Sequence, residues 1–404
     1  MADPEFMDNK ITFTKTMIAR LSIPETGRIT YHDMKLPGLQ LRVSSKGLKT
    51  FGVRTNFEGK TVRVTLGAFP KITVEEARKL AKGRLATIAE GKNPNALKKA
   101  YLAKQITLQQ CLDEYLKSRS SLKETTAKSY VSILNQYLGD WLNKPLLQIR
   151  RDHIEDRHKA IGKTFPTSAN KVMRIVRALF EYAHGKYEDE NGDPVFAHNP
   201  VKRLSHARAW FKETRRISFI KTSDLKQWYE AVNTGPQWLD TPDPVLICDY
   251  LKLVLFTGLR RREAAGLRWD WIDFDQKTLT LPDTKNGYAH SLPLSDYLYS
   301  LLKNREKNCS EFVFPGSGKT GHLEEPKKSV ANIRSRSEIY FTIHDLRRTF
   351  ITIAESLDIR DYTLKRLLNH RSSGDVTDGY IMSDVERLRE PMEKISAFIQ
   401  STVN

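Results

Sequence analysis

The hydrophobic periodicity changes along the chain, and this change limits the folds that the chain can adopt. Between residues 39 and 66, apolar and polar residues alternate, which is the period of a strand with one buried face. From Thr107 onward, apolar residues recur at three- and four-residue spacings, which is the period of a helix. The sequence therefore predicts an α+β protein, and its 404 residues suit two or three domains of ordinary size.

The alternating segment predicts a small three-stranded antiparallel sheet. Its strands are residues 39–43, 49–57 and 61–66. One face is expected to be apolar and carries Leu39, Leu41, Val43, Phe51, Val53, Val62, Val64 and Leu66. The other face carries Arg42, Arg54, Asn56, Arg63 and Thr65. Because alternate side chains point to opposite faces of a strand, the sheet has an apolar back. We expect a helix that begins at a Thr73–Glu76 capping box to cover this back.

Positive charge is concentrated in the same part of the chain. The formal net charge is +18, and residues 10–104 contribute +14 of it, from 20 basic and 6 acidic residues. Such a charge favours a polyanionic partner, above all nucleic acid; a basic protein without such a partner is the alternative. No acidic residue interrupts the basic front of the sheet. We therefore favour a surface for double-stranded DNA at Arg42, Arg54, Asn56 and Arg63 over a merely solvated face, and a sheet face of this size can enter a major groove.

The rest of the composition excludes several classes of protein. A hydrophobic fraction of 39% allows packed cores, but no run approaches the roughly 20 apolar residues of a membrane-spanning helix. Nothing at the start of the sequence has the pattern of a secretory signal. Cys111, Cys248 and Cys309 are too few for a disulfide framework, and neither they nor the ten histidines have metal-like spacing. We expect a cytoplasmic protein without a membrane partner, metal or cofactor.

Helical periodicity defines a middle region. A polar, lysine-rich segment at 95–105 is expected to be a linker, and a second capping box, Thr107 with Gln110, begins the helices. We interpret residues 106–200 as a helical bundle and residues 201–216 as a basic connector. The third helix of this bundle has cations every three residues on its polar side, a face that is either solvated or in contact with phosphate. These cations are Lys171, Arg174 and Arg177.

Six residues suited to phosphate chemistry are spread over residues 217–404. Arg260 and Glu263 lie three positions apart, so they share a helix face and can pair. Lys285 directly precedes Asn286-Gly287, a dipeptide typical of hairpin turns, between two short strand-like segments. The remaining four are His344, Arg347, His370 and Tyr380. Each residue alone is weak evidence, because surface arginines, satisfied core histidines and packed tyrosines are common.

Together, the order Arg…Lys…His-x-x-Arg…His…Tyr resembles the tyrosine recombinase family, in particular the lambda-type integrases of phages and genomic islands. Near the front of the chain, Leu36-Pro37-Gly38-Leu39, Thr65-Leu66-Gly67 and Glu76-Ala77-Arg78 resemble the arm-type DNA-binding domain of such integrases. The resemblance implies an arm-binding domain at 7–94, a core-binding domain at 106–200 and a mostly α catalytic domain with a small β-hairpin sheet at 217–404. Residues Met1 to Phe6 are expected to be a cloning remnant.

The resemblance also implies a reaction. Tyr380 attacks the scissile phosphate, and a 3′-phosphotyrosyl bond forms while the 5′ hydroxyl leaves. A phenol has a pKa of about 10, so its oxyanion at pH 7 costs roughly 4 kcal/mol, which nearby cations can offset. Arg260 and Arg347 are implied to hold the phosphate, Lys285 to protonate the leaving oxygen, and His344 and His370 to assist. Glu263 is expected to orient a guanidinium. The bond energy is conserved, so neither metal nor nucleotide is required.

In this family the active form implied is a homotetramer on two DNA sites in the bacterial nucleoid, with a host DNA-bending protein and an excisionase as further partners. Two other functions stay open: a type IB topoisomerase, which shares the chemistry, and a non-catalytic DNA-binding regulator. The regulator predicts that at least one of the six residues is missing, and none is. Site-specific strand exchange between two duplexes distinguishes the recombinase from the topoisomerase.

Two further segments need interpretation. Gly316 to Thr320 resembles the end of a nucleotide-binding loop, but Val313 stands where that motif requires glycine, so we reject this function. After Tyr380 the chain ends in an amphipathic helix with apolar residues from Leu388 to Ile399. From sequence, this tail packs equally well on its own domain or on a neighbouring subunit.

Overall fold

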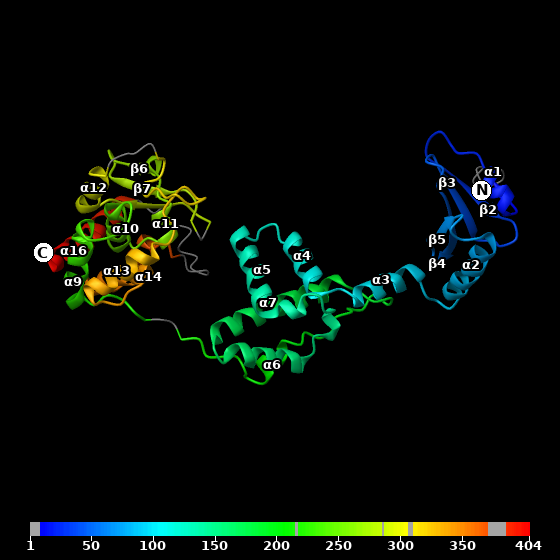
Figure 1. Ribbon diagram of the computed structural model, residues 1–404, viewed down its shortest axis with the longest axis horizontal. Coiled ribbons are helices and arrows are strands. Elements are labelled where there is room, and N and C mark those ends of the chain that lie inside the picture. Colours follow the sequence, from blue (N-terminus) through cyan, green and yellow to red (C-terminus); the bar gives the residue numbers. More distant parts are fainter. Residues whose placement is uncertain (1–8, 215–216, 285–286, 306–309, 371–384) are drawn as a thin grey trace. The chain divides into compact units, whose positions relative to one another are not determined.

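The computed structural model describes residues 9–214, 217–284, 287–305, 310–370 and 385–404. Within these ranges the chain divides into two compact units, Met1–Thr214 and Arg215–Asn404. Three separate hydrophobic clusters form the cores, two in the first unit and one in the second. The α+β class that the sequence predicts is confirmed (Figure 1). No helix of the described part is both long and apolar enough to cross a lipid bilayer.

The N-terminal sheet contains the three predicted strands and two more. Its order follows the sequence, with β1 parallel to β2 and every other pair antiparallel. The strands are β1 (Lys10–Ile11), β2 (Arg28–Asp33), β3 (Leu39–Ser44), β4 (Lys49–Phe57) and β5 (Lys60–Phe69). Sequence alternation did not reveal β2 because Asp33, at an inward position, is a buried carboxylate. It pairs with Arg78 at 2.8 Å, a contact that the local pattern cannot show.

Helices α1 (Lys15–Arg20) and α2 (Val74–Ala89) complete the first core, and α2 packs against β4 and β5 (Figure 1). The predicted capping box is present: Glu76 N–H donates to the Thr73 hydroxyl, and Thr73 N–H donates to the Glu76 carboxylate. The inward face of α2 buries Val74, Ala77, Ala81 and Ile88. The apolar back of the sheet is thus covered as expected, which leaves the basic front uncovered by α2.

The segment predicted as a linker at 95–105 is helical. Helix α3 spans Pro94–Lys104 and begins at Asn93, whose side chain accepts from Asn95 N–H. Proline at the first helical position and this cap both favour a helix start. Ala100 and Ala103 are buried, so the helix has a small packed face that the lysine-rich composition concealed.

The second core belongs to a helical bundle. Its helices are α4 (Leu108–Ser118), α5 (Glu124–Leu138), α6 (Arg151–Gly162), α7 (Pro166–Lys186) and α8 (Lys202–His206). The predicted Thr107–Gln110 capping box begins α4, and the apolar stripe of α7 is buried as the spacing predicts. The connector contains α8. The connector also contributes the aromatic pair Trp210 and Phe211, which pack against the bundle.

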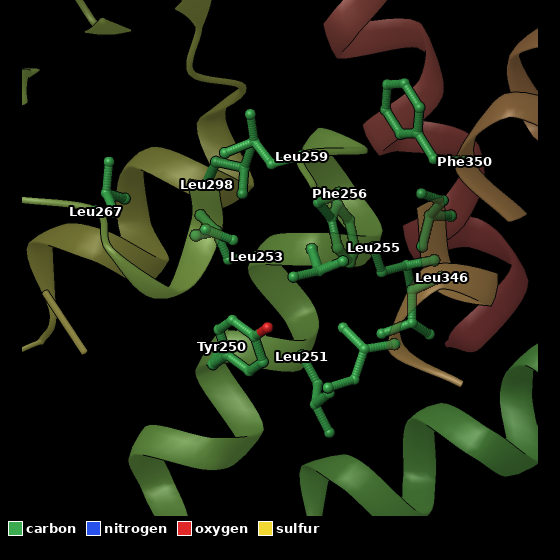
Figure 2. Packing of buried hydrophobic residues seen from close by; sticks show 14 of the residues in the cluster. Tyr250, Leu251, Leu253, Leu255, Phe256, Leu259, Leu267, Leu298, Leu346 and Phe350 are labelled. Carbon is green, nitrogen blue, oxygen red and sulfur yellow. The ribbon is translucent and has the colours of Figure 1, made fainter. Parts of the chain in front are cut away.

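The second unit is built around α10 (Pro244–Thr257), which packs against helices that come both before and after it in the chain. Figure 2 shows its apolar side chains meeting Leu346 and Phe350. The other helices are α9 (Thr222–Asn233), α11 (Arg261–Ala265), α12 (Asp296–Lys303), α13 (Lys327–Ser337), α14 (Ile343–Ser356), α15 (Asp361–Leu367) and α16 (Arg389–Val403). A small antiparallel sheet contains β6 (Ile272–Asp273), β7 (Thr278–Leu281) and β8 (His290–Pro293), so the predicted hairpin is present.

The C-terminal helix α16 packs on its own domain. Met392, Ile395, Ile399 and Val403 are buried in the core of the second unit, against α9, α10 and α14. Glu393 also accepts from Asp296 N–H at 3.0 Å. Of the two arrangements that the sequence left open for this helix, the structure has the one within the chain.

Candidate active site

Arg260 is held at the junction between α10 and α11. Gly258 ends α10 in the left-handed conformation, with φ of 63°, and turns the chain so that Arg260 becomes the N-cap of α11. Glu263 accepts from the Arg260 backbone N–H at 3.2 Å and from the Arg260 guanidinium at 2.9 Å. Both the main chain and the charged group of Arg260 are therefore fixed by one carboxylate, the pair that the spacing predicts.

Arg347 lies in α14 and is only 3% exposed. Its guanidinium donates to the carbonyl of Gly258, to the carbonyl of Leu368 at 2.8 Å and to His370 Nε2 at 3.0 Å. Burial and then the positive charge of Arg260 lower the pKa of Arg347 to about 10, although it remains charged at pH 7. The structure thus brings two guanidinium groups together, with Glu263 as the carboxylate that partly compensates their charge.

The geometry assigns a tautomer to His370. A guanidinium can only donate, so His370 Nε2 must accept and the proton of the neutral ring must be on Nδ1. Desolvation, followed by the charges of Arg347 and Arg260, lowers the pKa of His370. The neutral form that this bond needs is therefore the form present at pH 7.

His344 lies on the first turn of α14, three residues before Arg347, and its side chain is exposed. Partial desolvation, then the charges of Arg348 and Arg347, lower the pKa of His344. His344 is therefore neutral at pH 7, and it lies close enough to Arg348 and Arg347 for their charges to affect its pKa.

The first turn of α14 is fixed by a residue that our sequence analysis missed. Asp345 is fully buried and accepts from Thr342 N–H and hydroxyl, both at 2.8 Å, from the Ser218 hydroxyl and from Arg348. Burial alone would raise the pKa of Asp345, but these hydrogen bonds lower it below its usual value. The spacing of Thr342 and Asp345, a capping-box pattern, was the available signal.

Two more residues that were not predicted, Asn369 and His290, fix the end of α15. Asn369 adopts a left-handed conformation, with φ of 50°, and ends the helix in a Schellman motif: His370 N–H donates to Lys365 C=O at 2.8 Å and Asn369 N–H to Arg366 C=O at 3.1 Å. His290 of β8 donates from Nε2 to Leu367 C=O at 3.1 Å. The His290 contact spans 77 residues, so no local pattern signals it.

Lys285 and Tyr380 lie outside the described residues. Of the six predicted site residues, the structure therefore describes Arg260, His344, Arg347 and His370, and it gathers these four at one place with Glu263. No group of three or more histidine, cysteine, aspartate or glutamate side chains arranged to hold a metal ion occurs in the described ranges.

The predicted basic face of the sheet is also assembled. Arg54 and Arg63 are direct cross-strand partners on β4 and β5. Arg28, Arg42, Arg54 and Arg63 line one groove on this face, and burial together with the charges of the other three lowers the pKa of Arg42. Arg28 was not predicted, because β2 was not. Asn56 accepts from the Thr61 hydroxyl at 3.3 Å near the end of the same strand pair.

The three predicted cations of α7 have different surroundings. Arg174 forms an ion pair with Glu213 of the connector at 2.7 Å, and Lys171 donates to the Ser129 hydroxyl at 3.2 Å. The side chains of Lys171, Arg174 and Arg177 are all exposed. A role for them in contacting phosphate stays a prediction.

The buried arginine pair with its two histidines, and a basic sheet domain earlier in the chain, fit the class of tyrosine-type DNA strand transferases. Residues 218–387 match the Phage integrase family, and residues 13–101 match the Arm DNA-binding domain. The chain belongs to the phage integrase family and is a site-specific tyrosine recombinase of the lambda type. The topoisomerase and the non-catalytic regulator are not favoured.

Similar proteins span nearly the whole chain. Prophage integrase IntF of Escherichia coli K12 is 24% identical over 436 residues, covering 96% of this chain and 90% of IntF. The integrase of Shigella phage Sf6 is 23% identical, covering 88% and 91%. A lambda integrase tetramer bound to a Holliday junction has a TM-score of 0.54 at 20% identity, covering 84% of this chain and 97% of that one. At this sequence identity, the similarity to the lambda integrase structure shows a shared fold.

Proposed function

We propose that this recombinase integrates and excises a mobile DNA element, with Tyr380 as the nucleophile and Arg260, Lys285, His344, Arg347 and His370 as its catalytic partners. The observation that carries the proposal is the buried Arg347 beside Arg260, with Glu263 compensating only part of their charge. Adjacent buried cations are unfavourable unless an anion joins them. A DNA phosphate supplies that anion, and guanidinium groups bind phosphate in a bidentate manner.

The reaction follows from the placement of charge. The Tyr380 oxygen forms a bond to phosphorus while the bond from phosphorus to the 5′ oxygen breaks, and Lys285 gives that oxygen a proton. Arg260 and Arg347 stabilise the negative charge on the non-bridging oxygens, where an arginine can contribute about 10³–10⁵ in rate. The Nδ1–H of His370 is available as a further donor. Attack by the 5′ hydroxyl of a second strand reverses the step and rejoins the backbone.

The proposed division of labour follows the domains. Residues 7–94 bind arm sites through the basic front of the sheet, residues 106–200 bind the core site, and residues 217–404 carry out the chemistry, with 95–105 and 201–216 between them. The lambda integrase structure is a tetramer on a Holliday junction, and we extend this assembly to a homotetramer of the present chain on two DNA duplexes. A host DNA-bending protein and an excisionase are its proposed accessory partners, in the bacterial cytoplasm.

The test is capture of the covalent intermediate. A nicked duplex that carries the attachment core, found by sequencing DNA that flanks the gene, loses its short 5′-hydroxyl fragment after cleavage and traps the enzyme on the 3′ end. We expect the wild-type protein to form this adduct, and Tyr380→Phe to bind the duplex with unchanged affinity but form none. An adduct of normal yield in Tyr380→Phe overturns the assignment of the nucleophile.

A further inference from the structure

The side chain of Asn369 links two segments that carry catalytic residues. Asn369 is 8% exposed, and its Nδ2 donates to the Thr284 hydroxyl oxygen at 2.9 Å. Thr284 directly precedes Lys285 in the sequence, and His370 directly follows Asn369. One hydrogen bond between buried groups therefore joins Thr284, the neighbour of the proposed general acid, to Asn369, the neighbour of His370.

The Thr284 end of this link closes the hairpin turn. The Thr284 hydroxyl donates to the carbonyl of Tyr288 at 2.9 Å, and Gly287 N–H donates to the carbonyl of Thr284 at 2.9 Å. The Thr284 oxygen thus accepts from Asn369 and donates across the turn at the same time. Movement of Thr284 away from α15 would stretch the bond to Asn369, whereas the bonds to Tyr288 and Gly287 lie within the turn itself.

The Asn369 end is equally fixed. Arg347 holds the carbonyl of Leu368 and the ring of His370, on either side of Asn369. The second arm of the hairpin is held by His290, which donates to Leu367. The hairpin therefore contacts the end of α15 through Thr284 before the turn and through His290 after it.

We propose that Asn369 is a positioning residue for catalysis, which fixes Thr284, the residue that precedes Lys285 in the sequence, relative to Arg347 and His370. The inference rests on the function proposed for Lys285. The left-handed position of Asn369 needs a residue that tolerates positive φ, and glycine tolerates it best. Asparagine tolerates it too, and it adds the donor that reaches Thr284.

The decisive variant is Asn369→Gly, which keeps the backbone conformation and the Schellman motif but removes the donor. Proton donation by a placed general acid contributes about 10²–10⁴ in rate. We expect Asn369→Gly to slow single-turnover cleavage of core DNA by tenfold or more, with binding and melting temperature unchanged. Thr284→Val should show the same loss, and Thr284→Ser, which retains the hydroxyl, should recover most of it.

A second substrate separates positioning of the acid from a general defect. Core DNA with sulfur in place of the bridging 5′ oxygen releases a thiolate, which needs no proton. We expect Asn369→Gly to cleave this DNA within twofold of the wild-type rate, whereas Arg347→Lys should be slow on both substrates. Equal slowing of both substrates by Asn369→Gly, or no slowing of either, overturns the proposal.

Lys285→Ala distinguishes failure of the positioning role of Asn369 from failure of the general-acid role of Lys285. If sulfur restores cleavage by Lys285→Ala but not by Asn369→Gly, the positioning role fails and the general acid stands. If sulfur fails to restore Lys285→Ala, the role proposed for Lys285 fails, and the inference about Asn369 fails with it.

Discussion

His290 shows how a single buried side chain supports the site without taking part in the chemistry. It is 6% exposed, and its Nε2 must carry a proton to donate to the carbonyl of Leu367. Burial lowers the pKa of His290 to about 4, with smaller opposing contributions from Glu263 and the Leu367 carbonyl. The imidazole is therefore neutral at pH 7, and acid disfavours the folded domain.

The stability of the catalytic unit should fall as the pH falls, because the pKa of His290 is lowered in the folded state. A histidine with a lowered pKa stabilises the native state fully above pH 6.5, the unfolded value, and this contribution is lost as pH falls toward 4. Between pH 7 and 4.5 we expect the wild type to lose about 2–3 kcal/mol more than His290→Gln, whose amide does not titrate. Hydrogen-exchange protection of α10 amides measures this, and equal losses in the two proteins would contradict it.

At this scale most of the local contacts were predicted, with the Thr342–Asp345 capping box as the exception, and the long-range contacts were missed. The Arg260–Glu263 pair follows from a spacing of three residues. The capping boxes that begin at Thr73 and Thr107 follow from the same spacing. The partner of His290 is 77 residues away and that of Asn369 is 85 residues away. Tertiary packing decides such pairs, and hydrophobic periodicity carries no information about them.

Among the elements, the strand pair β4–β5 places two like charges opposite each other. Arg54 and Arg63 are cross-strand partners, and like charges directly opposite one another destabilise a sheet. Arg42 and Arg28 add to the same surface. Apolar packing on the back of the sheet fixes the register, so the arginines cannot separate by slipping. A polyanion removes the repulsion.

Substitution of this face should therefore affect arm-site binding alone. We expect Arg54→Ala or Arg63→Ala to weaken arm-DNA binding and to reduce the slope of log affinity against log salt by about 1. Cleavage of isolated core DNA should be spared. Lys79→Ala, an equal loss of charge at an exposed position of α2, is the matched control and should alter the slope little. Unchanged arm affinity of Arg63→Ala at every salt concentration would refute this interpretation.

Strand β2 marks the limit of pattern-based prediction for elements. Its inward positions are Ile29, Tyr31 and Asp33, and the carboxylate breaks the apolar series. The buried bidentate pair with Arg78 of α2 makes that position tolerable. Elements with uninterrupted periodicity, such as α4 and α7, were predicted correctly.

For the whole molecule, the connector between the two units is held at both ends. On the helical bundle, Asn170 of α7 donates to the Phe211 carbonyl at 2.9 Å and to Glu213 at 2.7 Å, and Phe211 packs against the His158 ring. On the catalytic unit, the Ser218 hydroxyl donates to Asp345 at 2.9 Å. Four residues, 214–217, separate these two attachments along the sequence.

Loss of the Asn170 contacts should loosen residues 209–214 on the helical bundle. We expect Asn170→Ala to accelerate hydrogen exchange in the peptide 209–214, because Phe211 N–H loses its acceptor, Asn170 Oδ1, at 3.2 Å. Arg174→Ala is the comparison: it removes the exposed ion pair with Glu213, which is worth about 0–1 kcal/mol, and a guanidinium 5.9 Å from the Trp210 ring, but it leaves the bonds of Asn170 in place. Slow exchange of this peptide in Asn170→Ala would show that aromatic packing alone holds the connector.

The turn at Gly258 fixes Arg260 and Arg347 before DNA binds. Its carbonyl accepts from Arg347, and two residues later the chain presents Arg260. A methyl group at Gly258 would lie 2.6 Å from the Phe350 ring. The spacing of the two cations is thus built into one stretch of main chain during folding. Incoming DNA meets a charge pattern already in place, so little solvent and side-chain rearrangement has to accompany each strand exchange.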